Sequence, residues 1–224
     1  MPPFSVVVGL ERGVLRDPKR RVMRRTSDMR GYYADSAALE KLIAGRDDPV
    51  HYEVQEVPVP EQRGHLMFCI SILQPGCVGN EFFMTKGHYH AVLGTAEIYL
   101  CLRGRGLMLM KTSVGECRSE PMERGRMVYV PPGWAHRSVN TGREPLVSFC
   151  VYPGEAGHNY GDIATEGFPK RVFRRGRRIV IEASQKSPVP AGPGFAKTLR
   201  RGAQARRGGG DDSRPTRNAG RQRA

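Results

Sequence analysis

The sequence of 224 residues contains little cysteine, a single tryptophan and no long hydrophobic run. No apolar stretch approaches the roughly 18 residues that a membrane-spanning helix needs, so we expect no transmembrane segment and no membrane partner. The N-terminus, MPPFSVVVGLERG, has no basic region ahead of its short apolar stretch, which is not typical of a secretory signal. These absences predict a cytoplasmic protein.

The five cysteines are odd in number and never form a CxxC pair. This pattern argues against a disulfide framework and against a thiolate zinc site. Cys69, Cys101 and Cys150 lie within apolar runs. We therefore expect these three side chains to be small buried hydrophobic groups.

The formal net charge of +14 is unevenly distributed along the chain. Residues 187–224 hold nine basic and two acidic side chains, so half of the excess charge lies in this segment. The segment is rich in Gly, Pro and Arg and has almost no apolar pattern, which predicts a disordered tail after a folded domain of residues 1–186. Electrostatic contact of the tail with nucleic acid is conceivable, but a solubilising extension is the favoured interpretation.

Within the domain, only the segment ADSAALEKLIAGRDDP has a helical pattern. Asp35 or Ser36 can cap its start, and its leucine and isoleucine residues recur at helical spacing. The rest of the domain alternates short apolar runs with Gly and Pro clusters, which is typical of an all-β sandwich or barrel. The six predicted strands are residues 51–57, 65–73, 97–104, 106–112, 127–131 and 145–153.

Two further segments carry specific predictions. The stretch LRGRGLML is expected to form a tight hairpin, because glycine supplies the backbone dihedrals that such turns need. The stretch KRVFRRGRR at residues 170–178 interleaves basic and apolar side chains and is followed by IVIEA, which favours a basic surface strand.

A candidate metal site begins in the stretch TKGHYH. In a strand, residues at positions i and i+2 point to the same face, so His88 and His90 can bind one ion. After six intervening residues Glu97 opens the next predicted strand, and the rigid turn of PPGWAH presents His136. Three imidazole nitrogens and one carboxylate oxygen suit Fe2+, Mn2+, Ni2+ or Zn2+ and leave two octahedral positions open.

These motifs resemble a known family. GxHxH followed by six residues and Glu, and then PPGWAH, resembles the two sequence blocks of the cupin superfamily, which are jelly-roll barrels with a central metal. The runs EFFMTKGHYHAVLGTAEIYL, MVYVPPGWAHRSVN and VYPGEAGHNYGDIATEGF are similar to the cupin-type glucose-6-phosphate isomerases of archaea and some bacteria. The similarity covers about residues 4–182 and leaves out the basic tail.

The resemblance implies an all-β cupin jelly-roll barrel with one short N-terminal helix. It also implies an isomerase that interconverts glucose 6-phosphate and fructose 6-phosphate in glycolysis and gluconeogenesis. It implies a homodimer in which N-terminal strands add to the partner's sheet, with one divalent ion per subunit and Fe2+ favoured. The implied metal ligands are His88, His90, Glu97 and His136.

Roles for other side chains follow from the chemistry of the reaction. Glu97 is the candidate base, His158 a second acid or base, and Tyr152 a hydrogen-bond donor beside it. Thr85 and the Gly87 amide are expected to form an anion cradle with Ser71 on a neighbouring strand. The predicted substrate-binding set is Ser71, Thr85, Gly87, Tyr99 and Tyr160.

Two other classes of function remain open at this stage. A metal cupin such as an Fe(II) oxygenase would use the open metal positions for oxygen, and a non-catalytic sugar-binding cupin would act as a regulator. The polar set around the predicted metal favours the isomerase. His51 and His65 are expected to be structural or exposed, and Trp134 to pack over the barrel mouth.

Overall fold

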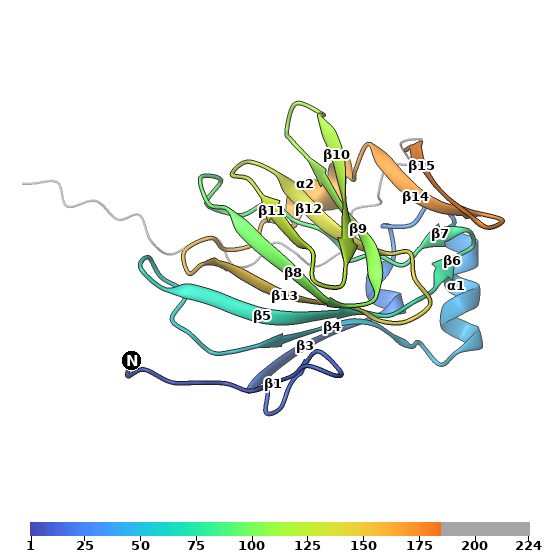
Figure 1. Ribbon diagram of the computed structural model, residues 1–224. Helices are drawn as coiled ribbons and strands as arrows, with labels where there is room; N and C mark the ends of the chain where they lie inside the picture. Colours follow the sequence, from blue (N-terminus) through green and yellow to red (C-terminus); the bar gives the residue numbers. More distant parts are fainter. Residues whose placement is uncertain (185–224) are drawn as a thin grey trace, which may run out of the picture. The chain divides into compact units, whose positions relative to one another are not determined.

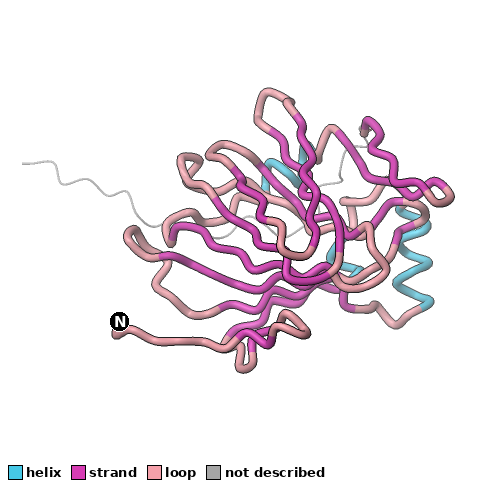
Figure 2. The backbone as a smooth tube through the Cα atoms, in the orientation of Figure 1, coloured by secondary structure: helices cyan, strands magenta, loops and turns pink. Residues whose placement is uncertain are grey.

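The computed structural model describes residues 1–184, so the predicted tail at residues 187–224 lies outside the described part of the chain. Strands dominate the described residues (Figures 1 and 2). The strands are β1 (Val8–Gly9), β2 (Val14–Leu15), β3 (Arg20–Arg25), β4 (Val50–Glu56), β5 (Leu66–Leu73), β6 (Cys77–Val78), β7 (Glu81–Phe82), β8 (Glu97–Arg103), β9 (Arg105–Lys111), β10 (Cys117–Glu123), β11 (Met127–Val130), β12 (Ala135–Asn140), β13 (Leu146–Pro153), β14 (Lys170–Arg175) and β15 (Arg178–Ala183).

The strands form three main antiparallel sheets. One has six strands in the order β11-β8-β13-β5-β4-β3, one has three in the order β10-β9-β12, and one has four in the order β15-β14-β7-β6. The six-stranded and three-stranded sheets stand as opposite walls in Figure 1, and buried side chains from both, such as Cys101 and Met108, join one hydrophobic core. The prediction of an all-β domain is confirmed.

Helix α1 (Ser36–Gly45) occupies the segment that the sequence predicts. The Asp35 carboxylate accepts a hydrogen bond of 2.8 Å from the Ala38 amide, which satisfies one of the amides left free at a helix start. Leu39 is 1% exposed and anchors the helix to the core. The prediction of a single helix is incomplete, because a 3-10 helix (Thr26–Met29) and helix α2 (Gly161–Glu166) are also present. Both are too short for a helical period to appear in the sequence.

The hairpin predicted for LRGRGLML is wrong. Strands β8 and β9 follow one another in sequence but belong to different sheets, so the chain turns a corner between two walls of the barrel. Gly104 has φ of +78°, and a Cβ atom there would lie 2.5 Å from the Pro145 carbonyl oxygen. A Cβ atom at Gly106 would lie 2.2 Å from the Val139 carbonyl oxygen. The glycines therefore allow close backbone approach at a corner rather than a hairpin turn.

The basic stretch at residues 170–178 is also more than one strand. It supplies all of β14 and the first residue of β15, and the two strands form a hairpin that turns between Arg175 and Arg178. Gly176 has φ of +61° in this turn. The exposed basic side chains of the hairpin include Arg175, which pairs with Glu182 across the strands at 2.9 Å.

Candidate metal centre and its pocket

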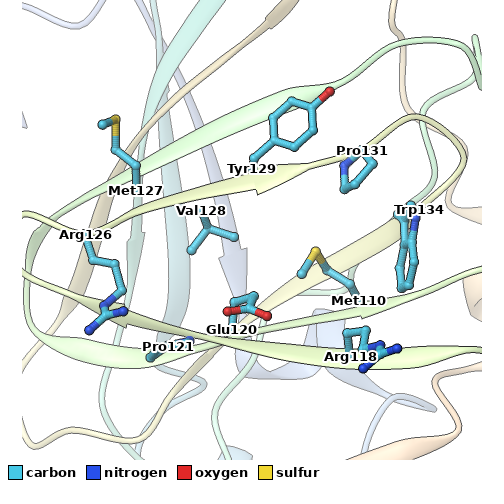
Figure 3. Close-up of a pocket in the computed structure, with 10 residues that line it drawn as sticks. All are labelled: Met110, Arg118, Glu120, Pro121, Arg126, Met127, Val128, Tyr129, Pro131 and Trp134. Atoms are coloured by element: carbon cyan, nitrogen blue, oxygen red, sulfur yellow. The ribbon is translucent and has the colours of Figure 1, made fainter.

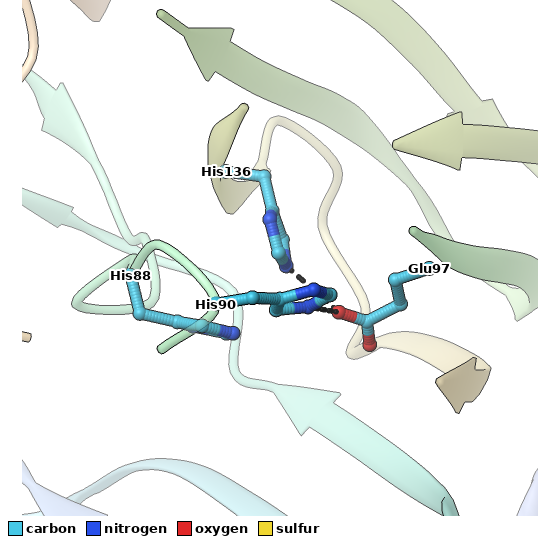
Figure 4. Close-up of side chains that lie close together, drawn as sticks. All are labelled: His88, His90, Glu97 and His136. Atoms are coloured by element: carbon cyan, nitrogen blue, oxygen red, sulfur yellow. Dashed lines mark hydrogen bonds and ion pairs between the residues drawn. The ribbon is translucent and has the colours of Figure 1, made fainter. Parts of the chain in front are cut away.

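Four side chains from three separate segments converge inside the barrel. His88, His90, Glu97 and His136 each present one ligand atom, and these atoms all lie within 4.8 Å of one another (Figure 4). Glu97 is 3% and His136 2% exposed, and His90 is 5% exposed. The four residues predicted from the motifs thus form one compact group, in which His88 is partly exposed and the other three are buried.

The two histidine segments are joined by their backbones. The His88 amide donates to the His136 carbonyl at 3.2 Å, and the His136 amide donates to the His88 carbonyl at 3.1 Å. This pair is an isolated bridge between a loop and β12, so His88 reaches the site from a loop that lies outside the six predicted strands. Gly87 makes the approach possible, because a Cβ atom there would lie 2.9 Å from the Phe168 ring and 3.0 Å from the His136 carbonyl oxygen.

Glu97 is held between two imidazoles. Its Oε2 atom lies 3.1 Å from His90 Nε2 and 3.0 Å from His136 Nε2. Burial by itself would raise the pKa of the Glu97 carboxyl, but its close contacts with His136 and His90 outweigh burial and lower it. Glu97 is therefore an anionic carboxylate across the neutral pH range.

Thr95 fixes the tautomer of His90. His90 Nδ1 lies 3.1 Å from the Thr95 carbonyl oxygen and 2.8 Å from its hydroxyl oxygen, and that hydroxyl donates to the Val92 carbonyl. Both Thr95 oxygens must therefore accept, so Nδ1 carries the proton. In the neutral ring the Nε2 atom then faces Glu97 with a lone pair, and two acceptors face each other.

A bound cation would resolve this conflict. His88 Nε2 is buried and has no hydrogen-bond partner among the described residues, although a buried polar atom normally has one. Burial, followed by the neighbouring His136, lowers the pKa of His88 well below its ordinary value, so the ring is a neutral acceptor. Unpaired lone pairs on His88 and His90 beside one carboxylate are the donor set that a divalent transition metal binds. The residues present fit such an ion.

A pocket of about 320 Å³ opens above the four residues. All of the predicted catalytic and substrate-binding residues line it together with three of the four metal-site residues; only His90 lies behind its wall. The lining residues are Arg20, Val22, Arg24, Tyr52, Val54, Glu56, Cys69, Ser71, Thr85, Gly87, His88, Glu97, Tyr99, His136, Ser138, Cys150, Tyr152, His158 and Tyr160.

The expected placement of Ser71 beside Thr85 on neighbouring strands is wrong. Ser71 lies in β5 of the six-stranded sheet, between Val54 and Ser148. The Thr85 backbone amide donates to the Ser138 carbonyl at 2.9 Å, and the Ser138 amide donates to the Thr85 hydroxyl at 3.1 Å, so Thr85 belongs to the opposite wall. Both residues still line the same pocket, which their hydroxyls reach from different walls.

His158 stands next to the metal-site residues without being one of them. Its ring centroid lies 4.5 Å from that of His88 and 5.5 Å from that of Tyr152, and its ring stacks on Tyr160 at 5.9 Å. Backbone hydrogen bonds between Asn159 and Tyr89 of 2.8 and 3.1 Å tie this segment to the histidine loop. Burial lowers the pKa of His158, so the ring is neutral near pH 7 and can accept a proton.

Several lining residues escaped the sequence analysis. Arg20, Val22 and Arg24 of β3 all face the pocket, at the spacing of two that places side chains on one face of a strand. This alternation is the signal that could have identified them. It is inconspicuous because β3 has the sequence RRVMRR, in which basic residues also occupy the outer face.

A second hollow lies outside the barrel, between β10 and β11 (Figure 3). Its lining includes Trp134, Met110 and Tyr129, and it shares no residue with the pocket above the metal-site residues. Trp134 therefore does not border that pocket. His51 is buried with its Nε2 atom 2.7 Å from the Tyr33 hydroxyl, and His65 is partly exposed; both lie outside the metal site.

Comparison with known proteins identifies relatives along most of the chain. A family model described as glucose-6-phosphate isomerase matches residues 23–187. The glucose-6-phosphate isomerase of Thermococcus gammatolerans is 52% identical over 179 residues, which cover 80% of this chain and 93% of that protein. The corresponding protein of Thermococcus litoralis is 47% identical over 82% of this chain and 96% of its own length.

More distant similarities extend beyond these archaeal proteins. A putative glucose-6-phosphate isomerase 2 of Rhizobium meliloti is 40% identical over 76% of this chain and 86% of its own length. A solved oxalate oxidase structure matches 50% of this chain and 56% of its own with a TM-score of 0.42 and 17% identity, which is too distant to inform the site. Among the described residues, no helix has the length and apolar character needed to cross a membrane.

Proposed function

The chain belongs to the glucose-6-phosphate isomerase family, and from this premise we propose that it interconverts glucose 6-phosphate and fructose 6-phosphate with the help of one divalent metal ion per subunit. The observation that carries the metal dependence is the unpaired His88 Nε2 atom beside His90, Glu97 and His136. Fe2+ is the ion we favour, and Mn2+, Ni2+ and Zn2+ share the same donor preferences. The reaction is a step of glycolysis and gluconeogenesis.

The isomerisation moves hydrogen between C1 and C2 of the open-chain sugar. A divalent ion held there would polarise the substrate carbonyl and stabilise the negative charge that develops beside it. Glu97 is the base we assign to a proton transfer through a cis-enediol, although the two imidazoles close to its carboxylate reduce its basicity. His158 is the neutral group that takes up and returns a hydroxyl proton, and Tyr152 lies beside it as a hydrogen-bond donor.

The phosphate end of the substrate is assigned to the mouth of the pocket. Arg24 lines the pocket from β3, opposite Tyr52 in the pairing with β4, while Thr85 and the Gly87 amide approach from the opposite wall. The Lys86 ammonium, 5.4 Å from the Tyr32 ring, adds positive charge nearby. These groups give a phosphate two cationic neighbours and several donors, which an apolar oxygenase pocket would lack.

Arg24→Ala is expected to raise KM for fructose 6-phosphate by about 10- to 100-fold with little change in kcat. A hydrogen bond to a charged group contributes about 1.5–3 kcal/mol, and this contact would be made equally in the ground and transition states. Steady-state kinetics at fixed ionic strength measure the effect. The control is Arg21→Ala, because Arg21 lies on the same strand but pairs with Glu53 at 3.0 Å outside the pocket. Equal KM values for the two variants would contradict this assignment.

The central test is an isomerase assay on the full-length chain after metal removal and reconstitution. We expect metal-free protein to be inactive and Fe2+, Mn2+, Ni2+ or Zn2+ to restore glucose 6-phosphate formation from fructose 6-phosphate. Activity of fully metal-free protein would refute the metal dependence, and no product with any ion would refute the isomerase. Deuterium from solvent entering the product would support the enediol route, because a hydride shift carries the substrate's own hydrogen.

We also propose a cytoplasmic homodimer. All five cysteines are free, which suits a reducing compartment. Strand β3 is an edge of the six-stranded sheet, and Phe4, Val7 and Met23 near it are each more than half exposed. An edge strand with exposed apolar side chains favours pairing with a partner protomer.

A further inference from the structure

Two cysteines in the wall of the substrate pocket have no part in the proposed reaction. Cys69 lies in β5 and Cys150 in β13, and the two are direct partners in the antiparallel pairing of these strands. Both line the pocket, and they are 7% and 1% exposed. The other buried cysteine, Cys101, has Ser148 as its partner on β13 and donates its thiol to the Arg103 carbonyl.

The register brings the two thiols to bonding range. Direct partners in an antiparallel pair point to the same face, with Cβ atoms about 4.5–5.5 Å apart. A disulfide needs a Cβ separation of about 3.5–4.5 Å, so the bond requires only a small approach of the strands. Both residues line the same pocket, which places their side chains on one face of the sheet. Burial and then the neighbouring Cys69 raise the pKa of the Cys150 thiol well above its ordinary value.

We propose that Cys69 and Cys150 form an oxidisable dithiol, which a peroxide converts to a disulfide in the pocket wall and a thiol reductant restores. The Cys69 sulfur, the more exposed of the two, attacks one peroxide oxygen; the O–O bond breaks, and a sulfenic acid and water result. The Cys150 sulfur then attacks the Cys69 sulfur, the S–O bond breaks, and a second water leaves. Two thiols are oxidised and one peroxide is reduced to two waters.

The new bond would disturb the site through its neighbours. Across the sheet, Cys69 pairs with Glu56, Cys150 pairs with Tyr99, and the Tyr99 hydroxyl lies 3.1 Å from His136 Nε2. A sulfur–sulfur bond of about 2.05 Å would draw β5 and β13 together where Cys69 and Cys150 face each other. A disulfide formed under such strain is readily reduced again, which makes the change reversible.

The test treats the purified full-length protein with hydrogen peroxide, quenches with catalase, and counts thiols after denaturation. We expect the count to fall from five to three, with a linked peptide pair containing Cys69 and Cys150 and a mass loss of two hydrogen atoms. Isomerase kcat/KM is expected to fall about tenfold or more and to recover with dithiothreitol, because small displacements of reacting groups are costly. The activity measurement rests on the proposed function, whereas the thiol count and the linked peptide do not.

Three variants keep the proposal falsifiable. Cys69→Ala should retain all four remaining thiols and keep its kcat/KM under the same treatment. Cys150→Ala should lose only the Cys69 thiol, as a sulfenic acid, and form no linked peptide, whereas Cys101→Ala should still lose two thiols. The proposal is overturned if the wild-type thiol count stays at five, if the linked peptides contain other cysteines, or if Cys69→Ala loses thiols as the wild type does. If the disulfide forms in an active enzyme and kcat/KM does not change, the proposed effect of the disulfide on the pocket is wrong.

Discussion

Glu97→Gln is expected to release the metal ion and to lower kcat/KM for fructose 6-phosphate by about 10³-fold. The carboxylate oxygen lies 3.1 and 3.0 Å from two imidazole nitrogens, and it carries the only negative charge in the four-residue site. An amide keeps the shape but removes that charge, so three neutral nitrogens must hold the cation alone. Loss of a general base by itself costs about 10²–10⁴-fold, and weaker metal binding adds to this loss.

Metal content per subunit, measured by mass spectrometry after dialysis, and steady-state kinetics test this expectation together. Glu123→Gln is the matched control, because Glu123 is an exposed carboxylate that pairs only with Arg126 at 3.4 Å among the described residues. We expect the control to keep its metal and its turnover within about twofold, as surface substitutions usually do. A Glu97→Gln variant with wild-type metal content and turnover would show that the site is wrongly assigned.

The metal site could be predicted from sequence because its residues lie close to rigid local features. His88 and His90 are two positions apart, Glu97 opens β8, and His136 lies three positions after the Pro-Pro-Gly turn. Strand alternation then places Glu97 and Tyr99 on one face, which the buried pattern of β8 shows. The position of α1 was predictable for the same reason, since Asp35 caps it from the adjacent residue.

The pairing of strands could not be predicted in the same way. A glycine-rich turn between two apolar runs suits both a hairpin and a corner between sheets, and the choice depends on contacts of Gly104 and Gly106 with residues 139 and 145. Such contacts form only when distant segments meet. The sequence therefore predicts β8 and β9 as strands but assigns them the wrong partners.

The same limit applies to the pocket wall. Ser71 and Thr85 share the pocket from opposite sheets, so their relation depends on closure of the barrel and on no local pattern. Cys69 and Cys150 are 81 positions apart in sequence, and only the register of β5 against β13 makes them neighbours. The sequence shows which residue type stands at each position, but it does not show which residue lies opposite on the neighbouring strand.

His158→Gln is expected to lower kcat by about 10²- to 10³-fold while metal content and melting temperature stay unchanged. His158 lies 4.5 Å from His88 between ring centroids, but it does not belong to the four residues that converge on one point. Glutamine keeps a polar side chain of similar length and cannot exchange a proton near neutral pH. The expected loss is that of one general acid or base.

The comparison with Glu97→Gln separates catalysis from metal binding. If His158 moves a proton, its substitution lowers kcat with full metal content, whereas loss of Glu97 lowers both quantities. His65→Gln is the control, because His65 is partly exposed and does not line the pocket. If His158→Gln loses metal in proportion to its loss of kcat, His158 is a metal ligand. If its kcat stays within about twofold of the wild type, His158 has no part in proton transfer. Either result would leave Glu97 as the proton-transfer group of the mechanism, and the two imidazoles close to its carboxylate make it a weak base.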